Sequence, residues 1–275
     1  MKRRPPVILE AEESEKFMDM AVLESGYAPW SEWKPKEYLS EYYAELMADE
    51  GFAMEFLVES LQRVPPAAVA LDFGCGPTVH HLFPLVPKVQ DIHLAEYLPA
   101  NRAEVERWLT CDAGAHDWEV FSRETLRLEG ASAPTGRAAR EREEQTRERV
   151  TAVLAGDAGE PDPLGPDRRA FYPLVTTHYC AEGATNSKET WALYMRNIAG
   201  LVCPDGVLIL SACAAADFYC VGDRHFPCAG VTCVDVLGWL SQNGFGDIDL
   251  RVRQVADHSK QGYGSVIFAC ATKQG

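Results

Sequence analysis

The sequence has no long hydrophobic run and little positive charge. Its longest apolar stretch, residues 206–216, is too short to span a bilayer. The basic start, residues 1–6, is followed by only three apolar residues and then by acids, so a signal peptide is not expected. There are 26 lysines and arginines against 41 aspartates and glutamates, which gives a formal net charge of −15. Because such a chain is repelled by nucleic acid and by anionic membranes, neither is predicted as a partner.

Paired cysteines are also absent. The nine cysteines contain no Cys-x-x-Cys pair, and their number is odd. Zinc sites and disulfide frameworks show tighter, paired spacing, so we expect reduced thiols, no metal and a cytoplasmic location. The length of 275 residues suits one large domain. The sequence does not determine the oligomeric state, and a monomer is expected.

Short apolar runs of strand length alternate with helical patterns. Strands are predicted at residues 67–73, 91–96, 150–154, 171–178, 207–210, 247–255 and 265–272. Helices are predicted within residues 31–63, 101–109, 122–149, 186–201 and 234–243, with a loop at 130–136. This alternation predicts an α/β fold with a parallel sheet covered on both faces. The last two strands are separated only by a loop, so they should pair antiparallel and complete a seven-strand sheet.

Chemically useful residues follow the predicted strands. Gly74 and Gly76 come after the first strand and allow the backbone to approach a ligand closely. Glu96 ends the second strand, where nucleoside-binding folds place an acid that accepts hydrogen bonds from ribose hydroxyls. Asp157, after the third strand, could accept from the amine of adenine. Ligands of open parallel sheets bind beyond these strand ends, so the set predicts a nucleoside cofactor.

The glycine pattern indicates which nucleoside cofactor is bound. Residues 74–78 read GxGPT and lack the third glycine of the dinucleotide fingerprint GxGxxG. No provision for a pyrophosphate is evident. The pattern therefore favours S-adenosylmethionine over NAD.

These residues resemble the family of nicotinamide, phenylethanolamine and thioether (indolethylamine) N-methyltransferases. The resemblance runs from about residue 30 to the C-terminus. It rests on PKEYLSEYY at 35–43, LDFGCGPT at 71–78, Glu96 and Tyr97 with Asn101, residues 108–109 and 117–118, CAE at 180–182 and FYCVG at 218–222. It implies a class I methyltransferase fold, Rossmann-like, in which residues 1–63 form an N-terminal helical lid and residues 64–275 form the catalytic part of the same domain.

The resemblance also implies roles for individual residues. The residues expected to bind the cofactor are Tyr38, Tyr43, Gly74, Cys75, Gly76, Thr78, Glu96, Tyr97, Asn101, Asp157, Ala158 and Tyr179. The residues expected to act in catalysis are Tyr38, Tyr179, Glu182 and Ser211. The residues expected at the acceptor are Glu182, Tyr219 and Asp217. Glu182 matches the acid that meets the substrate amine in the phenylethanolamine branch.

Two departures leave the reaction open. Tyr179 stands where the family commonly has Leu or Phe, and Ser211 or Ala212 stands where the nicotinamide branch has an acid. The main hypothesis is methyl transfer to a small amine or related heteroatom. The first alternative is cyclisation of S-adenosylmethionine itself, as in azetidine-2-carboxylate-forming relatives, with Tyr179 holding the sulfonium by cation–π attraction. The second is a nucleoside-binding protein without catalysis.

Several of these residues also have a purely structural interpretation. Tyr38 and Tyr43 could be core aromatics, Glu182 could cap a helix, and Asp217 could be a surface acid. Five histidines are expected to pack without a chemical role, although a general base is conceivable after the glycine turn. They are His80, His81, His178, His225 and His258.

Overall fold

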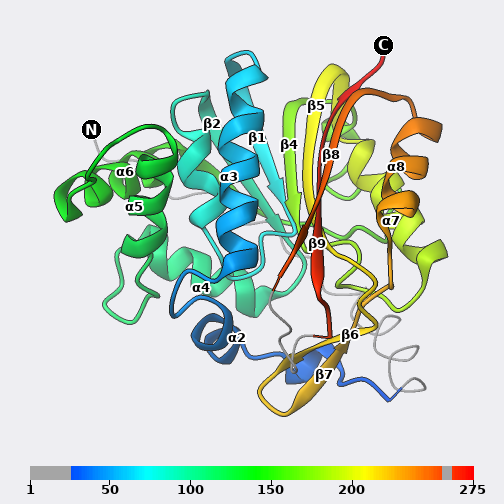
Figure 1. The fold of residues 1–275 in the computed structure, drawn as a ribbon, viewed down its shortest axis with the longest axis horizontal. Helices are drawn as coiled ribbons and strands as arrows, with labels where there is room; N and C mark the ends of the chain where they lie inside the picture. Colours follow the sequence, from blue (N-terminus) through cyan, green and yellow to red (C-terminus); the bar gives the residue numbers. More distant parts are fainter. Residues whose placement is uncertain (1–25, 256–261) are drawn as a thin grey trace.

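A seven-stranded sheet forms the centre of the protein in the computed structural model, which describes residues 26–255 and 262–275 (Figure 1). Its order is β3-β2-β1-β4-β5-β9-β8. The strands are β1 (Ala67–Phe73), β2 (Val89–Glu96), β3 (Val150–Ala155), β4 (Tyr172–His178), β5 (Val202–Cys213), β8 (Phe245–Gln254) and β9 (Ser265–Lys273). Strands β1 to β5 pair in parallel, and β9 is antiparallel to both β5 and β8. The predicted α/β fold and its antiparallel terminal hairpin are confirmed.

Helices cover both faces of the sheet (Figure 1). The helical elements are η1 (Trp30–Glu32), α2 (Pro35–Tyr42), α3 (Ala48–Arg63), η2 (His80–Leu85), α4 (Pro99–Leu109), α5 (Glu119–Leu128), α6 (Gly136–Arg149), η3 (Pro166–Arg168), α7 (Lys188–Ala199) and α8 (Cys233–Gln242). One core contains residues of α3, η2, α4 and α5, and the other contains residues of α7 and α8. Neighbouring residues of β1 enter opposite cores, Ala70 the first and Leu71 the second. This double burial explains the continuous apolar run in the sequence.

The loop predicted at 130–136 lies between two packed helices, α5 and α6, and residues 80–85 after the glycine turn form the 3-10 helix η2. In the N-terminal segment, α3 packs against the sheet strands β5 and β9, and its first turn reaches the strand ends together with η1 and α2. None of the helices in the described ranges is both long and apolar enough to cross a membrane.

A two-stranded hairpin, which the sequence did not indicate, lies beside α2 (Figure 1). It consists of β6 (Phe218–Val221) and β7 (Arg224–Pro227). The Tyr42 hydroxyl donates to the carbonyl of Cys220 at 2.7 Å, and the Gly222 N–H donates to the Glu41 carboxylate at 3.0 Å. These bonds attach the hairpin to α2 at the carboxyl ends of the parallel strands.

Candidate functional site

A cavity of about 180 Å³ opens beyond the carboxyl ends of the parallel strands. It lies where the sheet order reverses, between β1 and β4, which is the usual ligand site of an open parallel sheet. Fourteen of the predicted site residues line it. They are Tyr38, Tyr43, Gly74, Cys75, Gly76, Thr78, Glu96, Tyr97, Asn101, Asp157, Ala158, Tyr179, Glu182 and Tyr219.

Glu96, at the end of β2, is held by three hydrogen bonds. Its carboxylate accepts from the N–H of Gly76 at 2.9 Å, from the N–H of Leu98 at 2.8 Å and from the Asn101 amide at 3.0 Å. The side chain is buried, and burial raises its pKa although these bonds act in the opposite direction. A carboxylate has about four acceptor positions, so roughly one remains for a ligand.

The glycine turn after β1 brings the backbone close to the cavity. Gly74 and Gly76 have φ values of 71° and 60°, in the left-handed region that favours glycine. A methyl group on Gly74 would lie 2.0 Å from the Cys180 Sγ, so position 74 has no room for a side chain. Gly76 has open space around it. The turn is closed by Thr78, whose hydroxyl donates to the carbonyl of Cys75 at 2.8 Å.

The loop after β3 forms the next part of the wall. The Asp157 carboxylate accepts from the N–H of Gly159 at 2.7 Å, which fixes the loop. Asn197 of α7 donates to the carbonyl of Ala158 at 2.8 Å. Asp157 and Ala158 therefore face the cavity from a loop that is anchored to a helix.

Aromatic side chains of η1, of α2 and of the residue that follows each of them cover the cavity. The hydroxyls of Tyr38 and Tyr43 lie 3.3 Å apart, and their rings meet edge to face with centroids 5.5 Å apart. Trp33 packs on Tyr38 with centroids 4.9 Å apart. Its indole N–H donates to the Asn101 side chain at 2.7 Å. Since Asn101 also donates to Glu96, the aromatic cover is connected to the carboxylate at the end of β2.

Tyr179, directly after β4, has a strained backbone. Its φ is 51°, which is uncommon for a bulky residue. Its hydroxyl is buried and has no hydrogen-bond partner among the described residues, and burial raises its pKa well above the usual range. Strain and an unpartnered polar atom that persist at a cavity wall are typical of a ligand site.

Glu182 is a further buried acid in the wall of the cavity. It is 2% exposed, and its carboxylate accepts from the N–H of Cys213 at 3.0 Å. Burial raises its pKa to about 7. A carboxyl group with this pKa can accept or release a proton near neutral pH.

Two predicted site residues lie elsewhere, and those predictions are corrected. Ser211 is buried in β5, where its side chain bonds the His178 Nδ1 at 2.8 Å, and it does not line the cavity. Asp217 is exposed and also lies outside the lining. Successive residues of a strand point to opposite faces of the sheet, so spacing alone did not decide the orientation of Ser211 within β5. His258 lies outside the described residues.

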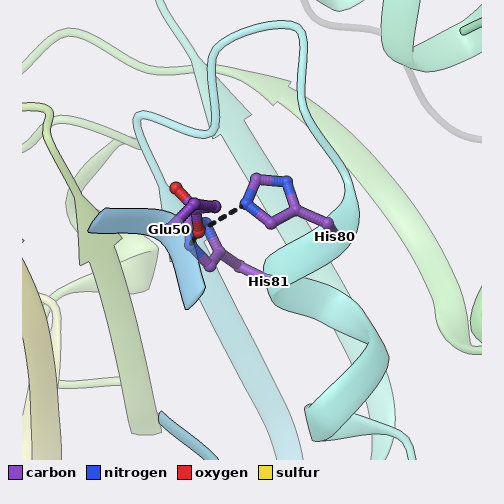
Figure 2. Close-up of side chains that lie close together, drawn as sticks. All are labelled: Glu50, His80 and His81. Carbon is purple, nitrogen blue, oxygen red and sulfur yellow. Dashed lines mark hydrogen bonds and ion pairs between the residues drawn. The ribbon is translucent and has the colours of Figure 1, made fainter. Parts of the chain in front are cut away.

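A second group of polar residues in the wall was not predicted as a site. Asp49 and Glu50 come from the first turn of α3, His81 from η2 and His178 from the end of β4. Asp49 accepts from the hydroxyl of Tyr263. Figure 2 shows the imidazoles of His80 and His81 directed at the carboxylate of Glu50.

The charges of this group follow from burial and contact. Burial would raise the pKa of Glu50, but the neighbouring imidazoles of His81 and His80 hold it well below its usual range. Burial lowers the pKa of His80 to about 4 and that of His178 well below its usual value. At neutral pH the group therefore contains an ionised carboxylate and neutral imidazoles at positions 80 and 178.

Comparison with known proteins gives consistent results. A model of the NNMT/PNMT/TEMT family matches residues 23–274. Phenylethanolamine N-methyltransferase of Sus scrofa is 27% identical over 258 residues, which cover 89% of this chain and 90% of that enzyme. Indolethylamine N-methyltransferase of Oryctolagus cuniculus is 29% identical over 234 residues, or 81% of this chain and 88% of that enzyme.

A solved structure shares the fold. It is the Burkholderia thailandensis 1,6-didemethyltoxoflavin-N1-methyltransferase with bound 1,6-didemethyltoxoflavin and S-adenosylhomocysteine. The TM-score is 0.51 at 17% identity, with coverage of 98% of this chain and 94% of that chain. At this identity the similarity concerns the fold.

Proposed function

Because the chain belongs to the NNMT/PNMT/TEMT family, we propose that it transfers the methyl group of S-adenosylmethionine to the nitrogen of a small amine. Its fold and its relatives make it an enzyme of the S-adenosylmethionine-dependent methyltransferase type. The acceptor is the part that we infer from this chain's own residues. The observation that carries the inference is that a buried acid, Glu182, lines the same cavity as the residues expected to bind S-adenosylmethionine.

The strand-end residues have the features that S-adenosylmethionine requires. Gly76 has open space where a side chain would lie, so a ligand can approach the backbone of the turn closely. Glu96 keeps roughly one acceptor position for a ribose hydroxyl. The Tyr179 hydroxyl, which has no hydrogen-bond partner among the described residues, gives the cavity a polar atom that a ligand can engage. When bound, the cofactor supplies an electrophilic methyl group on a sulfonium.

On the acceptor side, Glu182 would receive the amine. In its ionised form it attracts an ammonium group and takes one proton, which leaves a neutral nitrogen with a free lone pair. The C–S bond then breaks as the C–N bond forms, and S-adenosylhomocysteine and the methylated amine are the products. Aromatic side chains nearby, such as Trp33 and Tyr219, line the cavity and would contact the apolar part of the amine and exclude water.

Cyclisation of the cofactor receives less support from the structure. It needs a pocket that closes around the cofactor alone. The cavity continues from Tyr179 to Trp33, Tyr219 and Tyr263, beyond the residues expected to contact the cofactor. Ser211, which motivated the cyclisation hypothesis together with Tyr179, does not line the cavity. We therefore retain methyl transfer as the single proposed reaction.

The test is mass spectrometry of the protein incubated with S-adenosylmethionine, with and without a panel of small amines. We expect S-adenosylhomocysteine and a methylated amine only when an acceptor is present. Release of methylthioadenosine without any acceptor would instead establish cyclisation. In wild type, the rate of methyl transfer should increase as the pH passes about 7 and Glu182 becomes ionised. Glu182→Gln should lose this increase. Asp217→Asn removes an exposed acid and should keep the increase.

A further inference from the structure

Figure 2 shows three potential metal ligands that converge, and two of them, Glu50 and His81, line the cavity. Glu50 Oε1 lies 2.8 Å from His80 Nε2 and 2.7 Å from His81 Nε2. The potential ligand atoms of the three residues all lie within 4.8 Å of one another. Glu50 comes from α3, and the two histidines come from η2.

We propose that Glu50, His80 and His81 bind a divalent transition metal of the zinc type. Two imidazole nitrogens and one carboxylate are a donor set used by catalytic zinc and by non-haem iron. Both imidazoles direct Nε2 at the same carboxylate oxygen, so the donors already share one focus. Small shifts of these side chains would place one ion between them.

The charge at this position also favours a cation. The side chains of Glu50, His80 and His81 are at most 6% exposed. In the described ranges, the Glu50 carboxylate hydrogen-bonds to the imidazoles of His80 and His81, and no lysine or arginine hydrogen-bonds to it. A second carboxylate, Asp49, precedes it in the same helical turn. A divalent ion would compensate this buried negative charge.

Neighbouring rings hold the ligands in place. His80 stacks on Trp118 with centroids 5.0 Å apart and an interplanar angle of 13°. His81 stacks on His178 with centroids 3.8 Å apart and an angle of 21°. Glu50 sits in the first turn of a 16-residue helix, and its N–H donates to Asp49 Oδ1 at 2.9 Å. Since the donors are already ordered, binding of an ion costs little reorganisation.

The site would be open on one side. Glu50 and His81 line the cavity, whereas His80 lies behind them. A metal with three protein ligands keeps a position for water or substrate, and here that position would face the cavity. There it would bind a donor atom of the acceptor and lower the pKa of that group. This role rests on the proposed function, but binding of the metal does not.

The experiment is a titration of the full-length, chelator-treated protein with Co²⁺, without cofactor or acceptor. We expect one equivalent to bind and to give visible cobalt absorption without a thiolate charge-transfer band, because the donors are nitrogen and oxygen. Zn²⁺ should displace the cobalt. Glu50→Gln and His81→Gln should each weaken cobalt binding by more than about 100-fold, since even partners outside the ligand shell are worth 10- to 100-fold.

His225→Gln is the matched control, because His225 is exposed on β7 and is not one of the three ligands. Circular dichroism and S-adenosylhomocysteine binding check that each variant folds. Cobalt that binds equally to wild type and to folded Glu50→Gln, or that shows thiolate bands, would overturn the proposal. So would a wild-type protein that binds S-adenosylhomocysteine but no cobalt. A metal-loaded protein that methylates no amine would overturn the proposed function and leave the metal site standing.

Discussion

Replacing Glu96 by glutamine should weaken the binding of S-adenosylhomocysteine. Three of about four acceptor positions of the carboxylate are occupied by Gly76, Leu98 and Asn101, so one charge-assisted hydrogen bond remains for the ligand. A bond of this kind contributes about 1.5–3 kcal/mol. At about 1.4 kcal/mol per tenfold change, the dissociation constant should increase roughly 10- to 150-fold.

The same substitution should affect the protein without ligand. The amide nitrogen of glutamine must face at least one of the N–H donors that Glu96 now satisfies. An unsatisfied buried donor costs about 1–3 kcal/mol. Part of this cost is offset because burial disfavours the charged form of Glu96. We therefore expect a net decrease of about 1 kcal/mol in the free energy of unfolding, measured in urea.

Isothermal titration calorimetry with S-adenosylhomocysteine measures the affinity. Glu160→Gln is the control, because it removes the same charge from an exposed acid close to the end of β3. The control should leave the dissociation constant unchanged. If Glu96→Gln binds within about threefold of wild type, the carboxylate does not hold the ligand, and the assignment of the strand-end site is wrong.

Three further predictions concern the same cavity. Because the pKa of Glu182 is raised to about 7, the folded protein binds this proton more tightly than the unfolded chain does. The free energy of unfolding of wild type, relative to that of Glu182→Gln, should therefore decrease by about 3 kcal/mol as the pH increases from below 4.5 to above 7. Urea unfolding at both pH values measures this difference, and a difference that does not change would contradict the burial argument. Gly74→Ala should lower the free energy of unfolding by more than about 2 kcal/mol, because its methyl group would collide with Cys180. Gly76→Ala should lower it only by the backbone strain of a positive φ, about 1–2 kcal/mol. Equal decreases would show that the contact with Cys180 relaxes freely. Tyr179→Phe removes a buried hydroxyl that has no partner in the part of the chain that the structure describes, and it should stabilise the ligand-free protein by about 1 kcal/mol in urea unfolding. A loss of stability would show that this hydroxyl has a partner in solution.

The strands could be predicted because a buried strand appears in the sequence as a short, continuous apolar run. Residues 70–73 of strand β1 are buried on both faces of the sheet and are apolar apart from Asp72, and the glycine turn and Glu96 follow at recognisable positions. The hairpin of β6 and β7 has strands too short to stand out in this way. Each strand has four residues, and only the turn at Gly222, with φ 63°, signals it. Hydrogen bonds to α2 stabilise it, and these are contacts between distant parts of the chain.

The group of Glu50, His80 and His81 could not be predicted for a related reason. An acid in the first turn of a helix is ordinary, because it interacts favourably with the helix dipole. Two histidines after a glycine turn are equally ordinary as packing residues. Their convergence depends on how α3 packs against η2, a contact between elements about thirty residues apart in the chain. No local pattern in the sequence encodes that distance.

The aromatic cover and the strand-end carboxylate act as one structural unit. Asn101 accepts from the indole of Trp33 with one end of its amide and donates to Glu96 with the other. A ligand that forms a hydrogen bond to Glu96 therefore touches a network that also fixes the position of η1 and α2. The acceptor side is bounded by the same aromatic residues. Occupation of the strand-end site should thus order the wall against which the acceptor binds, which favours cofactor binding before acceptor binding.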